Sequence, residues 1–188
     1  MKCLNTFLIL LFFLLAANMT SCKKAKPSAS EKEMPQQSEK KGESSTLADL
    51  YRYYTKNPRT QNEKEENSMI DYIAETGLSF ERDPSGIYYR IEKAGSDTHY
   101  KWGGACTAHY RGYFLNGDVF DSSYKKQKPI KFRLGQMVNA WNKILQLVGP
   151  GAKLTLITPS RHAYGEEGFP NFVPPNTIIA FDIETLAG

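Results

Sequence analysis

The segment from Ala105 to Ser123 constrains the fold more than any other part of the chain. Residues 105–114 follow the two-residue period of a β-strand, so alternate side chains share a face. One face carries Cys106, Ala108, Tyr110, Gly112 and Phe114. Asn116-Gly117 follows, and this pair is a strong hairpin signal because both turn positions tolerate positive φ. Val119-Phe120 then returns along the partner strand, which predicts an antiparallel hairpin.

Further extended segments surround this hairpin. Strands are predicted over residues 86–91, 129–134, 153–158 and 177–186. Helical spacing of apolar residues occurs at Trp141, Ile144, Leu145 and Val148 and predicts one helix over about 139–148. The predicted fold class is therefore α+β, with an antiparallel five- to six-stranded sheet wrapped on one short helix, over residues 81–188.

Two accessory helices are predicted before this domain, within residues 47–80. Apolar residues at i, i+3, i+4 and i+7 place Leu47, Leu50, Tyr51 and Tyr54 on one helical face. Asn57-Pro58 would end that helix. The second helix runs from about Glu63 to Thr76, with Met69, Ile70, Ile73 and Ala74 on one side and Gly77 as its stop. We expect these helices to pack on the main domain or on a second copy of the chain, as a homodimer contact.

The first residues have the pattern of an export signal. Residues 1–21 combine one positive charge, an apolar run and small residues, which is typical of a secretory signal rather than of a membrane span. Met19-Thr20-Ser21-Cys22 resembles the lipobox of bacterial lipoproteins, so we expect Cys22 to be lipidated. Residues 22–46 are a flexible tether, because their composition offers too little apolar surface to fold. The sequence predicts an exported lipoprotein, placed in the outer membrane facing the periplasm.

Composition excludes several classes of protein. The 188 residues carry a net charge of +4, and no nucleic-acid-binding motif accompanies it, so no nucleic-acid partner is expected. The 3 cysteines form no CxxC pair, and only Cys106 would remain as a thiol after removal of Cys3 with the signal and lipidation of Cys22. We expect neither a disulfide nor a metal site, and no cofactor. Lysines and an arginine between residues 125 and 133 form a basic cluster, interpreted as a solvated loop or a contact for an acidic partner.

Several motifs follow one another in a recognisable order over residues 86–186. They are Ala108-His-Tyr-Arg-Gly-Tyr-Phe-Leu-Asn-Gly-Asp-Val-Phe-Asp-Ser-Ser123, Phe132-Arg-Leu-Gly135, Trp141, Gly151-Ala-Lys153, Ala163-Tyr-Gly165 and Val173-Pro-Pro-Asn176. This order resembles the FKBP-type peptidyl-prolyl cis–trans isomerases, a family that also binds macrolide inhibitors. With its lipobox, tether and helices, the chain resembles more narrowly the periplasmic FKBP-type lipoproteins of Bacteroidetes, including the type associated with gliding motility.

The resemblance implies an FKBP-like fold and a pocket for the proline of a polypeptide substrate. Trp141 would form the pocket floor, and Asp121 would lie at its edge. The residues implied in catalysis are Asp121, Tyr164, Tyr110, Trp141 and Phe181. Those implied in substrate binding are Phe120, Phe132, Met137, Val138, Phe169 and Val173. The backbone N–H of Val138 and the hydroxyl of Tyr164 would donate hydrogen bonds to substrate carbonyls.

One departure from the family pattern leaves two functions open. The chain reads Met137-Val-Asn-Ala-Trp141, whereas the family usually has Gly directly before the Trp. A methyl group at Ala140 could hinder a tight approach or a positive φ. The first hypothesis is a folding catalyst for exported proteins, whose dry aromatic pocket favours the twisted Xaa-Pro amide. The alternative is a proline-peptide-binding or scaffold lipoprotein of the cell envelope with little turnover.

Overall fold

The computed structural model describes residues 45–187. The predicted signal at 1–21, the predicted lipidation site Cys22 and most of the predicted tether lie outside the described residues. Helical elements are α1 (Leu47–Leu50), the 3₁₀ turn η1 (Tyr51–Tyr53), α2 (Gln61–Thr76), α3 (Asn139–Ile144), η2 (Leu145–Leu147) and η3 (Ser160–His162). Strands are β1 (Glu81–Arg82), β2 (Tyr88–Lys93), β3 (Ala105–Phe114), β4 (Val119–Ser122), β5 (Ile130–Arg133), β6 (Lys153–Thr158) and β7 (Ile179–Thr185).

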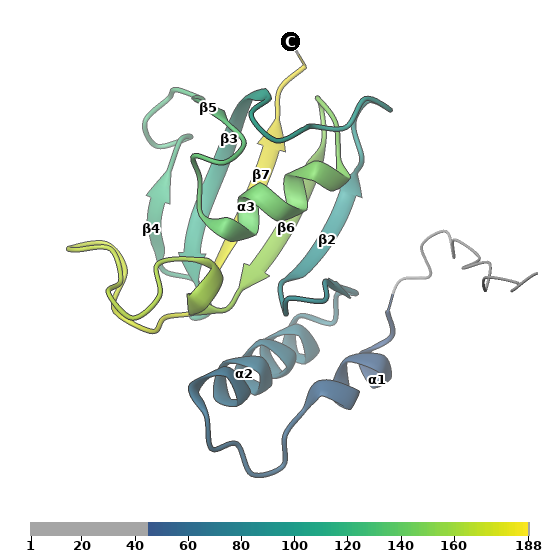
Figure 1. The fold of residues 1–188 in the computed structure, drawn as a ribbon, viewed down its shortest axis with the longest axis vertical. Helices are drawn as coiled ribbons and strands as arrows, with labels where there is room; N and C mark the ends of the chain where they lie inside the picture. Colours follow the sequence, from purple (N-terminus) through teal and green to yellow (C-terminus); the bar gives the residue numbers. More distant parts are fainter. Residues whose placement is uncertain (1–44, 188) are drawn as a thin grey trace, which may run out of the picture. The chain divides into compact units, whose positions relative to one another are not determined.

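All seven strands join one antiparallel sheet, which confirms the predicted α+β fold. Its order is β1-β2-β6-β7-β3-β4, and β5 also pairs with β3. The six predicted strands form, and the seventh is the two-residue β1, which is too short for its alternation to be read from sequence. Figure 1 shows α3 lying across one face of the sheet.

The hairpin between β3 and β4 forms, but its turn differs from the prediction. Gly117 has a φ of 91°, whereas Asn116 does not have a positive φ. The N–H of Phe114 bonds the carbonyl of Asp118 at 2.9 Å, so the loop has three residues. Next to the turn, the pairing of β3 with β4 shifts register between Gly112 and Tyr113, as in a β-bulge. A left-handed Gly at the end of a three-residue loop is a common hairpin geometry, which explains why one positive φ suffices.

The two faces of the sheet build two hydrophobic cores. The α3 face buries Trp141, Ile144, Leu145 and Val148 against inward side chains of the strands, as the helical spacing predicts. Alternation in β3 also holds, because Tyr110 joins this core while Tyr113 joins the other. A side chain buried in such a core contributes about 1.5–3 kcal/mol, which fixes α3 on the sheet.

Helix α2 covers part of the opposite face. Its buried residues Met69, Ile70 and Ile73 pack in a core with Tyr88 of β2 and with strand residues of β3, β6 and β7. Thr60 caps its N-terminus in a capping box with Glu63, so the helix begins at Gln61 rather than at about Glu63. It ends at Gly77, as predicted, where a left-handed φ of 64° suits glycine.

The first helix is shorter than predicted. It spans Leu47–Leu50 and continues as a 3₁₀ turn to Tyr53, whereas Tyr54 is extended, so the helix does not reach Asn57. Leu50 alone of the four predicted apolar-face residues is buried, and the others are 39–45% exposed. An isolated helix of this length is marginal, so it needs the packing of Leu50 against the buried side chains of α2. None of the helices within residues 45–187 is long and apolar enough to cross a bilayer.

Candidate functional site

Trp141, projecting from α3, lies at the centre of an aromatic cluster. The indole is 1% exposed. Three rings from three different strands meet it at steep interplanar angles. These are Tyr110 at 5.4 Å, Phe132 at 5.5 Å and Phe181 at 5.4 Å between ring centroids. Phe120 of β4 extends the cluster, 5.9 Å from Phe181. Edge-to-face contacts are favourable for aromatic rings, so the tertiary fold assembles five predicted site residues into one ordered group.

The cluster is poor in hydrogen-bonding partners. The indole N–H of Trp141 is buried, and no residue in the described range accepts its hydrogen bond. A buried donor left unpaired carries a free-energy cost, so its retention requires an explanation. A dry aromatic base of this kind stabilises weakly dipolar groups relative to strongly dipolar ones.

Asp121 is the charged group beside these rings. Its Oδ2 accepts a hydrogen bond from the Tyr110 hydroxyl at 2.5 Å, and its Oδ1 accepts from the N–H of Ser122 at 2.8 Å. Lys126 Nζ lies 2.5 Å from Oδ1. Burial raises the pKa of Asp121, but Lys126, Tyr110 and the Ser122 N–H together hold it below its ordinary value. Burial and the adjacent Asp121 raise the pKa of Tyr110, which therefore stays a neutral hydrogen-bond donor.

A break in strand pairing places Tyr110 at the site. The first half of β3 pairs with β5, and the second half pairs with β4. Ser123 fills the interval, because its Oγ accepts from the Tyr110 N–H at 2.8 Å and its own N–H donates to the Tyr110 carbonyl at 3.0 Å. The residue after Asp121-Ser122 therefore fixes the backbone from which the Tyr110 ring projects.

A cavity of about 710 Å³ opens beside Tyr110. Its lining combines apolar and cationic side chains. These are Tyr110, Ser123, Lys126, Lys128, Pro129, Ile130 and Lys131. Of these seven residues, only Tyr110 is among the predicted site residues. In the sequence, the lysines are visible only as part of the basic cluster, and Ile130 only as part of the alternation of β5. Neither pattern shows which side chains face the aromatic rings.

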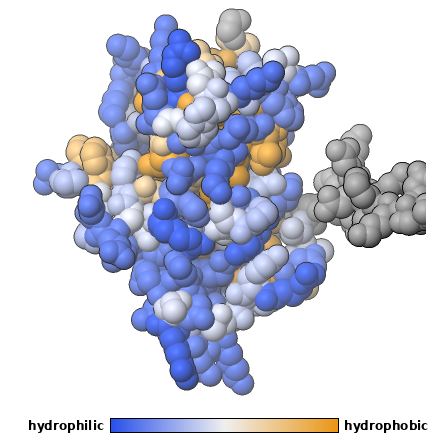
Figure 2. Space-filling view, viewed as in Figure 1, coloured by the Kyte–Doolittle hydropathy of each residue, from blue (hydrophilic) through white to orange (hydrophobic). Residues whose placement is uncertain are grey.

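A second aromatic group stands at the loop after η3. Tyr164 stacks on Phe169 at 5.2 Å, and Phe169 stacks on Phe172 at 5.0 Å. Phe169 and Phe172 are 45% and 51% exposed. The Tyr164 hydroxyl makes no hydrogen bond within residues 45–187, while burial and then Asp121 raise its pKa. On the face that carries α3, apolar residues reach the surface within largely hydrophilic surroundings (Figure 2).

The remaining predicted residues surround the same core. Met137 and Val138 are partly buried against the Trp141 cluster, and Val173 is buried within it. Val138 is the N-cap of α3, so its own N–H lies outside the helical hydrogen-bond ladder. Ala140 is a fully buried residue of α3 without a positive φ. A positive φ is therefore not needed at this position, whereas the expected hindrance of a tight approach by the methyl group stays a prediction.

The described residues offer no grouping of three or more His, Cys, Asp or Glu side chains that could hold a metal ion. What the site presents is a set of aromatic rings, one carboxylate, two tyrosine hydroxyls and a helix N-cap. Such a set can bind and desolvate a neutral group and can offer hydrogen bonds to carbonyl oxygens.

Comparison with known proteins identifies relatives of this domain. The profile of the FKBP-type peptidyl-prolyl cis-trans isomerase family matches residues 96–186. A probable FKBP-type peptidyl-prolyl cis-trans isomerase of Haemophilus influenzae is 36% identical over 123 residues, which are 65% of this chain and 51% of that protein. The chain thus spans about half the length of this curated relative.

Solved structures show the same likeness. The crystal structure of FkpA from Escherichia coli aligns with a TM-score of 0.61 at 29% identity, covering 68% of this chain and 58% of that one. The crystal structure of AtFKBP13 aligns with a TM-score of 0.54 at 34% identity, covering 58% of this chain and 98% of that one.

Proposed function

Because the chain belongs to the FKBP-type peptidyl-prolyl cis–trans isomerase family, we propose that it catalyses rotation about Xaa-Pro bonds in polypeptide substrates. The observation that carries this proposal is the buried indole of Trp141, which the rings of Tyr110, Phe132 and Phe181 meet at steep interplanar angles. Such a base accepts a proline ring and excludes water.

The chemistry needs no covalent step. Amide resonance sets a barrier of about 18–20 kcal/mol, and uncatalysed isomerisation takes tens to hundreds of seconds. The perpendicular amide of the transition state has lost that resonance and is less dipolar than the planar ground state. A dry aromatic pocket therefore binds the twisted form better, which is catalysis by differential binding.

Polar groups at the rim take defined roles in this proposal. The Tyr164 hydroxyl and the Val138 N–H donate hydrogen bonds to substrate carbonyls on either side of the proline. Asp121 orients the Tyr110 hydroxyl, and its carboxylate faces the carbonyl of the twisting bond. Phe169 contacts the residue beside the proline and favours bulky or apolar side chains there.

A protease-coupled isomerisation assay on Ala-Xaa-Pro-Phe peptides tests the activity with the full-length chain in detergent. We expect kcat/KM to fall at least tenfold in Trp141→Ala, with Trp102→Ala as a control because that indole is 66% exposed. Isomerisation no faster than in buffer, with proline peptides still quenching tryptophan fluorescence, would instead establish the alternative of a proline-peptide-binding scaffold. The exposed stack of Phe169 and Phe172 is the observation that favours this alternative.

We further propose that the chain is an exported lipoprotein anchored through Cys22, in the outer membrane facing the periplasm, which assists folding of exported proteins there. Its support is the lipobox and the apolar block before it, together with the resemblance to FKBP-type lipoproteins of Bacteroidetes. Several acyl chains would make the anchor effectively permanent. Cys22→Ala should move the protein from the membrane pellet to the soluble periplasmic fraction; retention in the pellet would reject the lipid anchor.

Two further partners belong to the proposal. Macrolide inhibitors of the family would bind at the aromatic cluster around Trp141 and compete with the peptide substrate. A homodimer would form through the first helices, where Leu47, Tyr51 and Tyr54 are exposed. Chemical cross-linking of the full-length chain should give a dimer that Tyr51→Glu weakens; a monomer at all concentrations would remove this role.

A further inference from the structure

Glu65 on α2 is a buried carboxylate outside the segment that the family profile matches. It is 3% exposed and points toward η3 rather than toward solvent. Its Oε1 accepts from the Ser160 hydroxyl at 2.6 Å, and its Oε2 accepts from the Ser160 N–H at 3.0 Å. Gln61 Nε2 also donates to Oε1, at 2.9 Å. A buried charge needs such partners, so the three donors fix both the carboxylate and the residue it holds.

Ser160 in turn fixes the backbone on both sides of Tyr164. Its carbonyl oxygen accepts from the N–H of Ala163 at 2.8 Å and from the N–H of Gly165 at 2.8 Å. Since the Tyr164 hydroxyl has no partner within residues 45–187, no side-chain hydrogen bond there holds this ring in place. The position of the ring therefore depends on these backbone bonds, on its stacking with Phe169 and on its packing against the core around Trp141.

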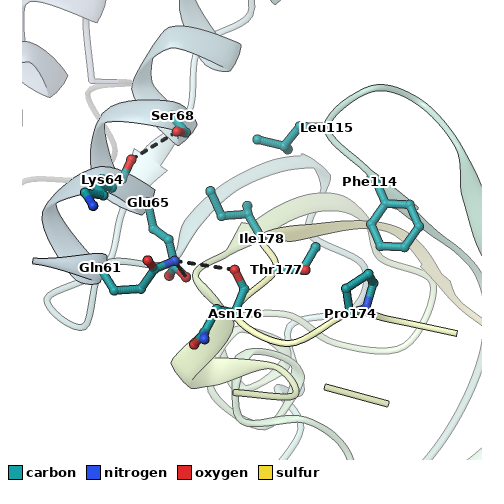
Figure 3. Close-up of a pocket in the computed structure, with 10 residues that line it drawn as sticks. All are labelled: Gln61, Lys64, Glu65, Ser68, Phe114, Leu115, Pro174, Asn176, Thr177 and Ile178. Carbon is teal, nitrogen blue, oxygen red and sulfur yellow. Dashed lines mark hydrogen bonds between the residues drawn. The ribbon is translucent and has the colours of Figure 1, made fainter. Parts of the chain in front are cut away.

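Helix α2 holds the same loop at a second point. Figure 3 shows Gln61 and Glu65 side by side on α2, with the Gln61 amide directed at the Asn176 carbonyl, a contact of 3.4 Å. Asn176 donates its N–H to the Gly165 carbonyl at 2.8 Å. Arg161 Nη1 also reaches Asn62 of α2 at 3.0 Å. Both ends of the loop that carries Tyr164 and Phe169 are thus tied to one face of α2.

The helix is itself a rigid support. Met69, Ile70 and Ile73 are no more than 1% exposed and pack against the sheet. The neighbouring Glu66 bonds Arg82 and Tyr88, which anchors α2 to β1 and β2 but does not touch the loop. Adjacent carboxylates of the same helix therefore have separate tasks, one toward the strands and one toward the loop.

We propose that Glu65 is a positioning residue that sets the Tyr164 hydroxyl for the substrate carbonyl, so that the helix preceding the isomerase domain completes its active site. The catalytic part of this proposal rests on the proposed isomerase function. Displacement of a hydrogen-bonding group by a fraction of an ångström is enough to lower turnover without abolishing the fold.

The test compares Glu65→Ala with Glu66→Ala in the full-length chain. Both remove a buried carboxylate from α2, so both should lower the melting temperature. We expect kcat/KM for an Xaa-Pro peptide to fall about tenfold in Glu65→Ala and to stay within twofold in Glu66→Ala. Glu65→Gln keeps one acceptor oxygen for Ser160 and should recover part of the loss. Ser160→Ala removes the hydroxyl that donates to Glu65 and keeps the backbone N–H that also donates to it. This variant therefore still tests the role of the contact if Glu65→Ala does not fold.

Hydrogen exchange separates this proposal from the proposed function. The amides of Ala163 and Gly165 should exchange at least tenfold faster in Glu65→Ala, and Ser160→Ala should accelerate them less, while Glu66→Ala leaves them unchanged. If the wild-type chain does not catalyse isomerisation, this measurement still decides whether Glu65 orders the loop. Equal acceleration in the Glu65 and Glu66 variants, or equal loss of kcat/KM in both, would overturn the assignment.

Discussion

Gly112 on β3 lies beneath the aromatic walls of the site, and replacing it with alanine tests the proposed pocket directly. An added Cβ would stand 2.7 Å from Phe120 Cζ and 2.9 Å from Phe181 Cε1. Gly112 has no positive φ, so alanine is compatible with its backbone. The substitution therefore acts through the two rings and not through backbone strain.

The size of the effect follows from these contacts. An ordinary contact of a Cβ begins at about 3.4 Å, so Phe120 must retreat by about 0.7 Å and Phe181 by about 0.5 Å. Overpacking of this kind costs about 1–3 kcal/mol of stability, which lowers the melting temperature by roughly 2–4 °C per kcal/mol. Because both rings face the proposed proline site, we expect kcat/KM to fall about tenfold.

Gly151→Ala is the matched control. Gly151 has a φ of 82°, and a Cβ there meets no atom within 4 Å. Alanine at this position costs roughly 1 kcal/mol or more through its backbone, far from the rings. We expect it to lower the melting temperature with kcat/KM unchanged. The assignment of Phe120 and Phe181 as pocket walls would be refuted by a Gly112→Ala protein that loses stability but isomerises peptides at the wild-type rate.

Three further predictions concern charge. Burial, and then the charge of Arg161, lower the pKa of His162. The contribution of His162 to the free energy of unfolding is therefore complete above the ordinary pKa of 6.5 and declines as the pH falls below it. Thermal melts from pH 7.5 to 5 should show this decline, and His162→Gln should flatten it. Asp121→Asn removes the charge that accepts the hydrogen bond of the Tyr110 hydroxyl and should lower kcat/KM severalfold. The wild-type pH–rate profile should stay flat from pH 8 to 5, because the pKa of Asp121 is held below its ordinary value. Lys126, Lys128 and Lys131 line the cavity beside Tyr110, so peptides with Glu near the proline should be preferred over peptides with Lys at low salt, and this preference should shrink in 1 M NaCl.

Local pattern was sufficient for most of the fold. Alternation in β3 and the Asn116-Gly117 signal specify the central hairpin, because a strand buried on one face must alternate whatever its neighbours are. The spacing of Trp141, Ile144 and Leu145 likewise specifies α3 and the face that it buries. The apolar spacing does not give the end of the first helix, because the spacing extends to Tyr54 whereas the α-helix ends at Leu50 and the 3₁₀ turn at Tyr53.

The motifs also predicted which aromatic residues meet. The family resemblance names Tyr110, Phe120, Phe132 and Phe181 as site residues together with Trp141, and they come from four strands. Three of them contact the Trp141 ring, and Phe120 contacts Phe181. Resemblance was needed for that step because alternation reveals only the face of the sheet on which a ring lies. It does not reveal which rings of different strands come into contact.

Only the tertiary structure decided what holds the site in place. Glu65 and Ser160 are separated by 95 residues, and nothing in either local pattern predicts that one accepts two hydrogen bonds from the other. The ion pair of Lys126 with Asp121 likewise depends on how the loop after β4 turns. Sequence periodicity shows which face of one helix or strand is buried, whereas these contacts depend on how separate elements pack against one another. The sequence therefore determines which aromatic residues the site contains, whereas the docking of α3, the strands and the loops determines how these residues are arranged.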